Sequence, residues 1–358
     1  MMKAILPLVA TLLASCGGPG LRPGALDAGL PAVVLRDAPR LEFPANTDCN
    51  SPAHWDGNTV HLFNSAGHPK RASGPDIFRL GPAAPSKYDN QVNGGRWIEC
   101  TWKDDDGTLY AWYHLEAGGL CPGMTLTAPR IGAVVSGDNG ENFRDLGIVL
   151  DARPGTLRCD AKNGFFAGGN GDFSVMLDPK KEHFYLFFSA YAGDVSEQGV
   201  AVARMRYADR LQPAGKVWKW HQGGWTEPGL GGRLTPIFPA TIEWARADAD
   251  AFWGPSIHWN SHLGLYVILL NRTKDRPGWP QEGIYVAFND DLGDPARWTK
   301  PVKIFDGGRW YPQVLGIDSA KRETDKLAGR VARFSMRGEN DRGESKWEIL
   351  FLRPGERP

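Results

Sequence analysis

The 358-residue chain carries 41 Lys and Arg against 41 Asp and Glu, so its formal charge is zero, and 42% of its residues are hydrophobic. This balance excludes a disordered polyelectrolyte, and no basic run of the kind that binds nucleic-acid phosphates occurs. The 44 Gly and 27 Pro residues predict many turns and few long helices. We therefore expect a turn-rich folded domain that does not bind nucleic acid.

The N-terminus, MMKAILPLVATLLASC, has the pattern of an export signal, in which one Lys precedes an apolar stretch too short to span a bilayer. The tetrad Leu13-Ala14-Ser15-Cys16 resembles the lipobox of bacterial lipoproteins, which implies a lipid on Cys16; an ordinary cleaved signal is the alternative. We expect a signal peptide at 1–15, a lipidated Cys16 with a Gly/Pro-rich tether at 16–40, and a domain at 41–358. The protein would then be exported and held on a membrane of the cell envelope, in the periplasm or at the cell surface.

Four further cysteines, Cys49, Cys100, Cys121 and Cys159, lie in the first half of the chain. In an oxidising compartment they allow two disulfides with three alternative pairings, or buried thiols. No CxxC motif occurs, and the spacing of His258 and His262 straddles a turn signal, so we predict no metal site.

Pairs of short strands separated by a turn signal recur along the chain. They are expected at 52–55 with 60–63, 97–102 with 109–113, 173–177 with 184–188, 255–259 with 265–270, and 313–317 with 347–351. A third strand is expected at 131–136, 199–204 and 283–288, and at 77–80 in the first unit. Five such units predict an all-β fold, a five-bladed β-propeller; a β-sandwich or two small β domains is the alternative.

The segment Ser136-Gly-Asp138-Asn-Gly140-Glu-Asn-Phe143 resembles the Asp-box, which marks the turn between the outer strands of a propeller blade in sialidases and related proteins. Its Asp accepts backbone N–H bonds and its Gly tolerates a positive φ. A degenerate copy begins at Asn289 and ends near Trp298. The motif makes a sialidase-like enzyme one alternative, although the expected cluster of three substrate-binding Arg residues is not identifiable.

Candidate site residues follow from the expected architecture, because the first strand of each propeller blade begins near the central axis. Positions six residues before the first turn are Asn50, Glu99, Asp172, Gly254 and Pro312, and Asp48 lies two residues before Asn50 on the same side of the strand. We therefore expect the carboxylates of Asp48, Glu99 and Asp172 to converge. Two aromatic residues are sequence neighbours of this set, Trp253 beside Gly254 and Tyr311 beside Pro312. In the second unit, the end of the second strand and the start of the third add His114, Glu116 and Arg130.

Converging carboxylates beside aromatic walls suit glycoside hydrolysis, in which one carboxyl protonates the leaving oxygen and another activates water. Asp48-Cys-Asn50-Ser-Pro52 followed by Trp55-Asp-Gly, together with Gly171-Asp172-Phe173, resembles segments of the five-bladed propeller glycoside hydrolases of families 43, 32 and 117. The resemblance implies Asp48 as the base, Asp172 as an orienting and pKa-tuning carboxylate, and inversion.

The sequence differs from family 43 at the position of the general acid, which in that family is a Glu from a blade after the second Asp. The expected fourth-blade segment, 252–255, contains no Glu, so Glu99 is assigned as the acid, with Glu116 behind it. Asn50, His114, Glu116, Arg130, Trp253 and Tyr311 are assigned to substrate binding.

The predicted function is hydrolysis of an arabinan- or xylan-type polysaccharide. A non-catalytic propeller that binds glycan or a protein partner is the alternative from another class. No cofactor is required, and an axial calcium ion stays open because its oxygen ligands leave no spacing signature.

Overall fold

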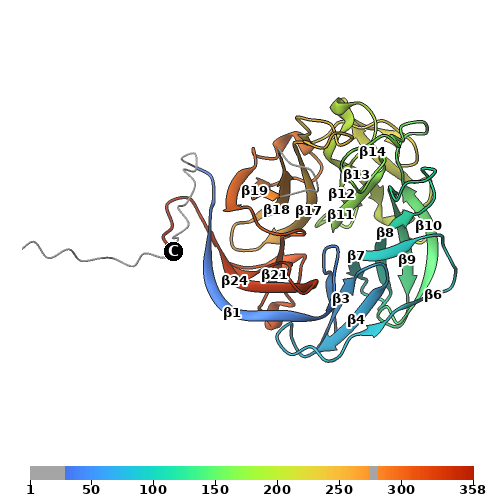
Figure 1. Ribbon diagram of the computed structural model, residues 1–358. Helices are drawn as coiled ribbons and strands as arrows, with labels where there is room; N and C mark the ends of the chain where they lie inside the picture. The colour runs from blue at the N-terminus through green and yellow to red at the C-terminus, as the bar shows by residue number, and fades with distance from the viewer. Residues whose placement is uncertain (1–28, 275–280) are drawn as a thin grey trace, which may run out of the picture.

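The computed structural model describes residues 29–274 and 281–358 of the chain. In this part, five mainly antiparallel sheets stand as blades around a central axis (Figure 1). This arrangement confirms the five-bladed β-propeller predicted from the repeated strand pairs. Cys16 and the predicted signal peptide lie outside the described residues. Among the described residues, no helix has the length and hydrophobicity needed to cross a membrane.

The blades, numbered I to V along the chain, have these strands. Blade I contains β2 (Ala53–Asp56), β3 (Thr59–Ser65), β4 (Pro69–Gly74) and β5 (Ala84–Pro85). Blade II contains β7 (Gly95–Lys103), β8 (Leu109–Ala117), β9 (Ala128–Ser136) and β10 (Asn142–Leu150), with β6 (Lys87–Tyr88) parallel to β10. Blade III contains β11 (Asn170–Leu177), β12 (His183–Ala190), β13 (Gly199–Arg206), β14 (Val217–His221) and β15 (Gly224–Pro228), with β16 (Phe238–Pro239) also paired to β13.

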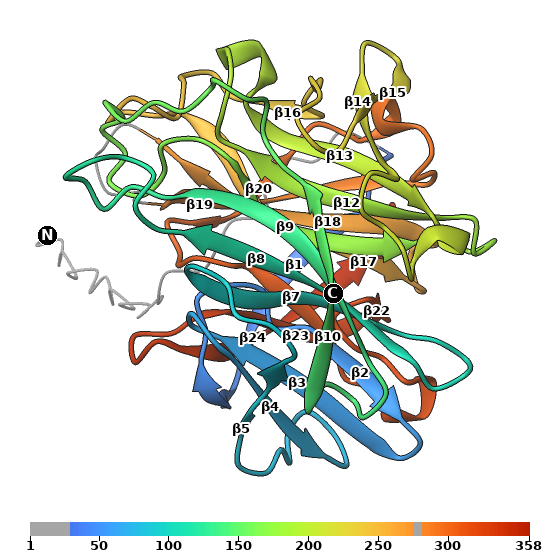
Figure 2. The same ribbon diagram turned by 90° about the vertical axis from the view of Figure 1, so that its right-hand side faces the viewer.

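Blade IV contains β17 (Ala251–Asn260), β18 (Leu265–Thr273), β19 (Gln281–Asn289) and β20 (Val302–Asp306), with β22 (Leu327–Ala328) parallel to β17. Blade V contains β21 (Gln313–Gly316), β23 (Val331–Arg337), β24 (Arg342–Leu352) and β1 (Ala32–Asn46). Short 3-10 helices occur in the connections: η1 (Val195–Glu197), η2 (Tyr207–Asp209), η3 (Pro295–Arg297) and η4 (Ser319–Lys321). Figure 2 shows the ring from the side, with β7, β8 and β9 lying next to one another.

The ring is closed by the two ends of the folded chain. Strand β1 pairs antiparallel with β24 from Ala32 opposite Leu352 to Asn46 opposite Arg342. The propeller therefore begins at Ala32 rather than at residue 41. This strand is hard to recognise in the sequence, because β1 lies on the outer edge of its blade and carries charged residues that interrupt an apolar pattern. Pairing it with β24 covers an edge that would otherwise expose unpaired backbone groups.

Two predicted strands differ from the structure. In blade I the third strand is β4, and 77–80 forms a turn. Strand β4 reads PKRASG, so its sequence lacks the apolar signal on which the prediction depended. In blade V the partner of β21 is β23, and β24, which contains residues 347–351, is the third strand.

Apolar side chains fill the spaces between adjacent blades. Between blades II and III, for example, Trp112, Phe173, Phe184 and Phe188 are at most 2% exposed. Burying each such ring contributes about 1.5–3 kcal/mol. The inner strands are covered on both faces, which explains why β12 reads HFYLFFSA with almost no polar side chain.

The Asp-box forms the predicted turn between β9 and β10. Asp138 Oδ1 accepts hydrogen bonds from Ser136 Oγ at 2.7 Å and from the main-chain N–H of Asn142 at 2.9 Å. Gly140 has a φ of +82°, and a Cβ there would lie 2.4 Å from Cζ of Phe63 in blade I. The motif therefore shapes the turn and seats it against the neighbouring blade.

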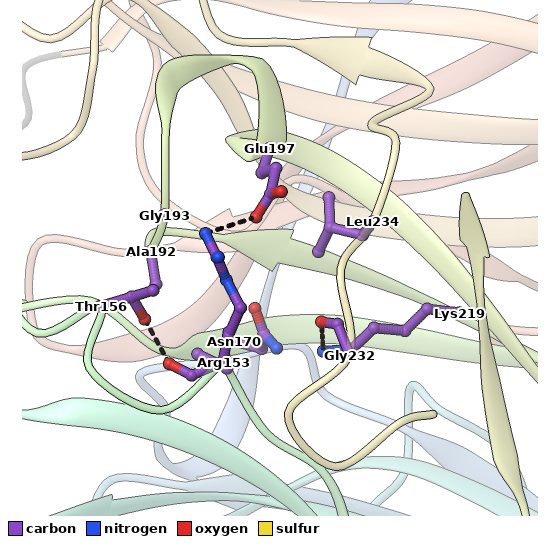
Figure 3. A pocket seen from close by; sticks show the side chains of 10 residues that line it. Arg153, Thr156, Asn170, Ala192, Gly193, Glu197, Lys219, Gly232 and Leu234 are labelled. Carbon is purple, nitrogen blue, oxygen red and sulfur yellow. Dashed lines mark hydrogen bonds and ion pairs between the residues drawn. The ribbon is translucent and has the colours of Figure 1, made fainter. Parts of the chain in front are cut away.

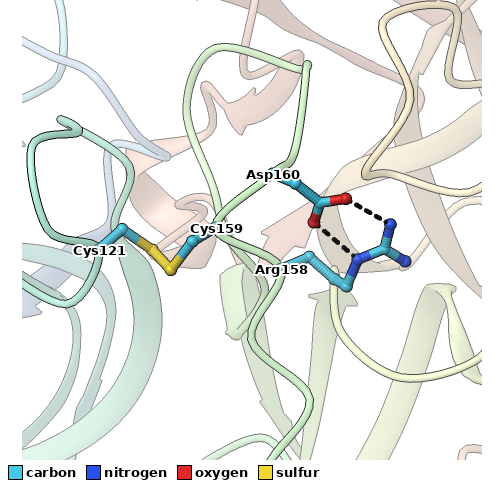
Figure 4. The surroundings of a disulfide bond; sticks show 4 residues. All are labelled: Cys121, Arg158, Cys159 and Asp160. Carbon is cyan, nitrogen blue, oxygen red and sulfur yellow. Dashed lines mark hydrogen bonds and ion pairs between the residues drawn. A yellow bond between two sulfur atoms is a disulfide. The ribbon is translucent and has the colours of Figure 1, made fainter.

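Of the cysteines predicted to pair or stay buried, Cys121 and Cys159 form a disulfide, and Cys49 and Cys100 are buried thiols. The disulfide joins the β8–β9 connection to the long connection that precedes β11 (Figure 4). Beside it, Arg158 and Asp160 make a two-point ion pair at 2.9 and 3.0 Å.

Candidate active site

The inner strands β7 and β11 each contain a β-bulge, at the middle of β7 and close to the start of β11. The bulges fall between Ile98 and Cys100 and between Gly171 and Phe173, so Glu99 and Asp172 are the residues left out of the ladder. A bulge re-aims the side chain of the unpaired residue. Asp172 also has a φ of +41°, a conformation that is costly for a residue with a Cβ and is concentrated at functional sites.

The two bulges bring Glu99 and Asp172 together around His114 of β8. His114 Nδ1 lies 3.2 Å from Glu99 Oε1 and 3.8 Å from Asp172 Oδ1. Glu99, His114 and Asp172 are 1–3% exposed, and His114 Nε2 lies 3.1 Å from Glu116 Oε1, also of β8. We call Asp48, Glu99, His114, Glu116 and Asp172 the axial cluster.

His114 Nδ1 has two alternative partners. In neutral imidazole it accepts a hydrogen bond from the main-chain N–H of Asp172 at 3.1 Å. In imidazolium it donates toward Glu99 Oε1. Burial alone lowers the pKa of His114, but the hydrogen bonds with Glu116 and Glu99 and the charge of Asp172 outweigh it, so the net shift is well upward. The ring therefore favours the charged form.

The buried carboxyls of the cluster hold their protons more tightly than isolated ones. Burial raises the pKa of Asp172 to about 7, with the charge of His114 opposing and that of Glu99 reinforcing the shift. Burial likewise raises the pKa of Glu99. Glu99 Oε2 accepts a hydrogen bond from the main-chain N–H of Phe173 at 2.9 Å, so this residue joins blade II to blade III.

Asp48 and Glu116 are the members of the cluster that reach solvent. The Asp48 side chain is 36% exposed and accepts a hydrogen bond from Arg337 Nη1 at 2.7 Å. Desolvation raises the pKa of Asp48 although Arg337 opposes it, and the charge of Glu116 adds to the rise. Glu116 is 26% exposed; desolvation raises its pKa, but hydrogen bonds with His114 and Thr127 give a net lowering.

The aromatic residues predicted as walls lie in one packed group. Tyr311 is 9% exposed, has a φ of +60°, and its ring centroid is 5.5 Å from that of Trp253. Burial and the charges of Asp172, Asp48 and Glu99 raise the pKa of Tyr311, so its hydroxyl shares the electrostatic environment of the axial cluster. Trp253 is fully buried, and its ring packs edge-on against that of Tyr311.

Two other predicted substrate-binding residues have protein partners instead. Asn50 is 2% exposed, and its Nδ2 donates to the carbonyl oxygens of Phe173 at 3.0 Å and Pro255 at 3.1 Å. Its amide thus links blades I, III and IV. Arg130 is 45% exposed and pairs with Asp151 at 3.1 Å, outside the axial cluster. Substrate contact at both positions stays a prediction.

Sequence reasoning missed two residues of the site, Tyr191 and Arg337. The Tyr191 hydroxyl donates to Asp172 Oδ2, and Arg337 pairs with Asp48. Tyr191 directly follows β12, the second strand of its blade, so the rule that selected His114 and Glu116 also covered it. Arg337 had no such signal, because the strand that carries it was not predicted.

Glu197 lies between the second and third strands of blade III, and its side chain is not part of the axial cluster. Its carboxylate pairs with Arg233 at 2.5 Å and Arg153 at 3.5 Å. A pocket of about 10 Å³ lies beside it, next to the buried Lys219, whose Nζ donates to the carbonyl of Gly232 at 2.9 Å (Figure 3). This space has room for about one water molecule.

Among the described residues, the group in the axial cluster that could hold a metal ion is Glu99, His114 and Asp172, whose ligand atoms all lie within 4.8 Å of one another. Calcium prefers six to eight oxygen ligands. The set offers two carboxylates and one imidazole nitrogen, and that nitrogen already faces a backbone N–H. The donor set therefore does not fit calcium.

No protein-family model and no curated protein matches the chain. Solved structures share its fold. It is similar to an exo-1,5-α-L-arabinanase from a bovine ruminal metagenomic library, with a TM-score of 0.52, 11% identity, and 87% of this chain and 94% of that chain covered. It is also similar to a thermostable family-43 glycoside hydrolase, with a TM-score of 0.51, 11% identity, and coverage of 87% and 92%. The chain thus has the five-bladed propeller fold of these glycoside hydrolases.

Proposed function

We propose that the protein is a glycoside hydrolase whose acid and base are carboxyls of the axial cluster. One observation carries the proposal. Asp48 and Glu116 come from different blades, both reach solvent, and Asp48 senses the charge of Glu116, yet their pKa values move in opposite directions. Hydrolysis of a glycosidic bond needs one carboxyl that donates a proton and one that accepts a proton, and groups whose pKa values move apart suit these two roles.

The directions of the shifts assign the roles. The raised pKa of Asp48 suits the proton donor to the leaving oxygen, and the lowered pKa of Glu116 suits the base. This exchanges the role that the family resemblance implied for Asp48 and moves the acid away from Glu99, which is 1% exposed and bound to the main chain of Phe173. His114 and Asp172 act as positioning residues. His114 lowers the pKa of Glu116, and the charge of Asp172 raises the pKa of His114.

Likeness in fold to an arabinanase and a family-43 enzyme supports polysaccharide as the substrate class. We therefore propose arabinan- or xylan-type chains as the first substrates to test.

Release of reducing sugar from arabinans, xylans, fructans and galactans tests the proposal. Asp48→Asn and Glu116→Gln should each lower the rate about 10²–10⁴-fold. The chain offers matched controls. Asp151 is 28% exposed, pairs with Arg130 and has a raised pKa, and Glu282 is 27% exposed, pairs with Lys303 and has a lowered pKa.

Asp151→Asn and Glu282→Gln should retain most of the activity. Equal activity in all four variants would refute the assignment of the pair. Binding of an oligosaccharide without hydrolysis, unchanged in Asp48→Asn, would favour a glycan-binding propeller instead.

Export and lipid attachment at Cys16 belong to the same proposal. The disulfide between Cys121 and Cys159 supports an oxidising compartment. Labelling of the expressed protein with radioactive palmitate should give a signal that Cys16→Ser abolishes. A signal that persists in that variant would contradict a lipid on Cys16.

A further inference from the structure

A second pocket lies on the outer part of blade III, where β13, β14 and β15 follow one another away from the axis (Figure 1). It encloses about 640 Å³. Ala190, at one end of β12, pairs with Asn170 next to the axial cluster, whereas His183, at the other end of β12, lines the pocket. Seven residues separate these two ends, or roughly 23 Å at about 3.3 Å per residue. The pocket is therefore remote from the axial cluster.

The strand register of blade III places two arginines among aromatic rings on one face of the sheet. Arg204 and Arg206 are two residues apart on β13, so their side chains point to the same side. Trp218 of β14 stands opposite Arg204, and His183 of β12 stands opposite Arg206. Arg204 Cζ also lies 4.8 Å from the ring centroid of Trp225. All five of these residues line the pocket.

Within the part of the chain that the structure describes, neither of these arginines forms an ion pair with a carboxylate. Arg206 is exposed and Arg204 is half-buried, so both guanidinium groups are open to solvent at the pocket. Their charge is felt by the neighbouring imidazole. Desolvation lowers the pKa of His183, and the charge of Arg204 lowers it further, although the charge of Asp178 opposes the shift.

The other two charged residues of the lining neutralise each other. Lys216 Nζ lies 3.1 Å from Asp209 Oδ1, and Asp209 is the one acidic residue among those that border the pocket. Three cations against one anion leave an excess of two positive charges, which come from Arg204 and Arg206. Trp218 is 45% exposed, so a flat ligand face can reach its indole.

We propose that this pocket binds a uronate residue of an acidic polysaccharide. The planar guanidinium groups of Arg204 and Arg206 match a carboxylate in shape and charge. The indole of Trp218 supplies an apolar surface for one face of the sugar ring. The choice of a polysaccharide rests on the proposed function. The pocket holds one part of the polysaccharide while the axial cluster acts on another.

Isothermal titration calorimetry of the whole protein with trigalacturonate and with its trimethyl ester tests this inference. A salt concentration of about 0.1 M screens exposed charges that are more than about 10 Å apart. The acid should bind once per chain, and the neutral ester about tenfold more weakly, because it loses the charge-assisted hydrogen bonds. Absence of saturable binding by the acid, or equal affinity for the ester, would overturn the proposal. Tighter binding of a sulfated galactose trisaccharide would overturn the assignment to a uronate.

Arg206→Met tests the charged contact. It should weaken binding of the acid about fivefold and leave binding of the ester unchanged. The matched control is Arg144→Met, since Arg144 of β10 is also an exposed strand residue without a carboxylate partner among the described residues. It should change neither affinity. Equal losses in the two variants would indicate general charge attraction and would refute a site at Arg206.

Trp218→Ala tests the contact with the sugar ring and should weaken binding of both the acid and the ester. Its control is Phe78→Ala, because Phe78 is 48% exposed and Trp218 is 45% exposed. Unchanged affinity for the acid in Trp218→Ala would contradict the assignment to this pocket.

Asp48→Asn separates this proposal from the hydrolytic one. That variant should retain the affinity for trigalacturonate, whether or not the parent protein releases reducing sugar. Loss of that affinity in Asp48→Asn would place the ligand at the axial cluster and overturn the inference.

Discussion

Glu99 of blade II accepts a hydrogen bond from the main-chain N–H of Phe173 in blade III, with 2.9 Å between Oε2 and N. The other carboxylate oxygen, Oε1, lies 3.2 Å from His114 Nδ1. One buried side chain therefore satisfies the backbone next to the Asp172 bulge and faces the imidazole of the cluster. This double role makes Glu99 a structural link between two blades as well as a part of the site.

Substitution of Glu99 separates these roles. Glu99→Ala should lower the free energy of unfolding by about 1–3 kcal/mol, because the N–H of Phe173 loses its buried acceptor. Glu99→Gln keeps an acceptor oxygen and should lose less stability. If Glu99 were the general acid, Glu99→Gln would abolish hydrolysis; on the present assignment it retains measurable activity. Urea unfolding and reducing-sugar release measure the two effects.

The pH dependence of hydrolysis should follow the two solvent-reaching carboxyls. Glu116 must be ionised, and its lowered pKa sets the acidic limb of the profile, whereas Asp48 must be protonated, and its raised pKa sets the basic limb. Arg337→Met removes the positive charge that opposes protonation of Asp48, so the basic limb should move to higher pH. A shift of the acidic limb to higher pH, with the basic limb unmoved, would reverse the assignment of acid and base.

Asp172 should make the fold less stable as the pH rises. Its pKa of about 7 in the folded protein lies above the ordinary value of 3.8, so folding takes up a proton between these values. The free energy of unfolding therefore falls as the pH rises through this window. Asp172→Asn should remove this part of the slope, and the fall that remains includes the contributions of His114 and Glu99, whose pKa values are also raised. Denaturant titrations from pH 4 to 9 measure both slopes, and an unchanged slope in Asp172→Asn would contradict the shift.

The Asp-box glycines offer a test of the blade contact. Gly140→Ala places a methyl group 2.4 Å from Phe63 at a φ of +82° and should destabilise the protein by about 1–3 kcal/mol. Gly137→Ala, in the same turn, meets no atom within 4 Å and should be nearly neutral. Thermal unfolding compares the two variants. Equal melting temperatures would show that the turn is not seated on blade I.

Ring closure by β1 can be tested at Val34, which pairs with Leu350. Val34→Pro removes a backbone N–H from β1 and fixes its φ, so it should cost about 1–3 kcal/mol. Val34→Thr keeps a β-branched side chain and the backbone N–H, so it should cost much less. Nearly equal losses in the two variants would mean that β1 contributes little to the stability of blade V.

The sequence predicted four of the five inner strand pairs and the Asp-box turn, because these depend on local patterns. Alternating or continuous apolar residues and a turn signal are visible in any short window, as at β12 or at the segment from Ser136 to Phe143. The polar strand β4 and the outer strand β1 have no such pattern, since their stability comes from the neighbour they pair with.

The sequence by itself determined which residue types stand at the starts of the inner strands, and so it placed Glu99 and Asp172 among the site candidates. Only the tertiary structure decided what each one does. The bulges, the position of His114 between the two carboxyls, and the exposure of Asp48 and Glu116 arise from the packing of different blades around one axis. The pKa shifts that separate an acid from a base depend on that burial and on neighbours more than a hundred residues away in the chain, such as Arg337 beside Asp48.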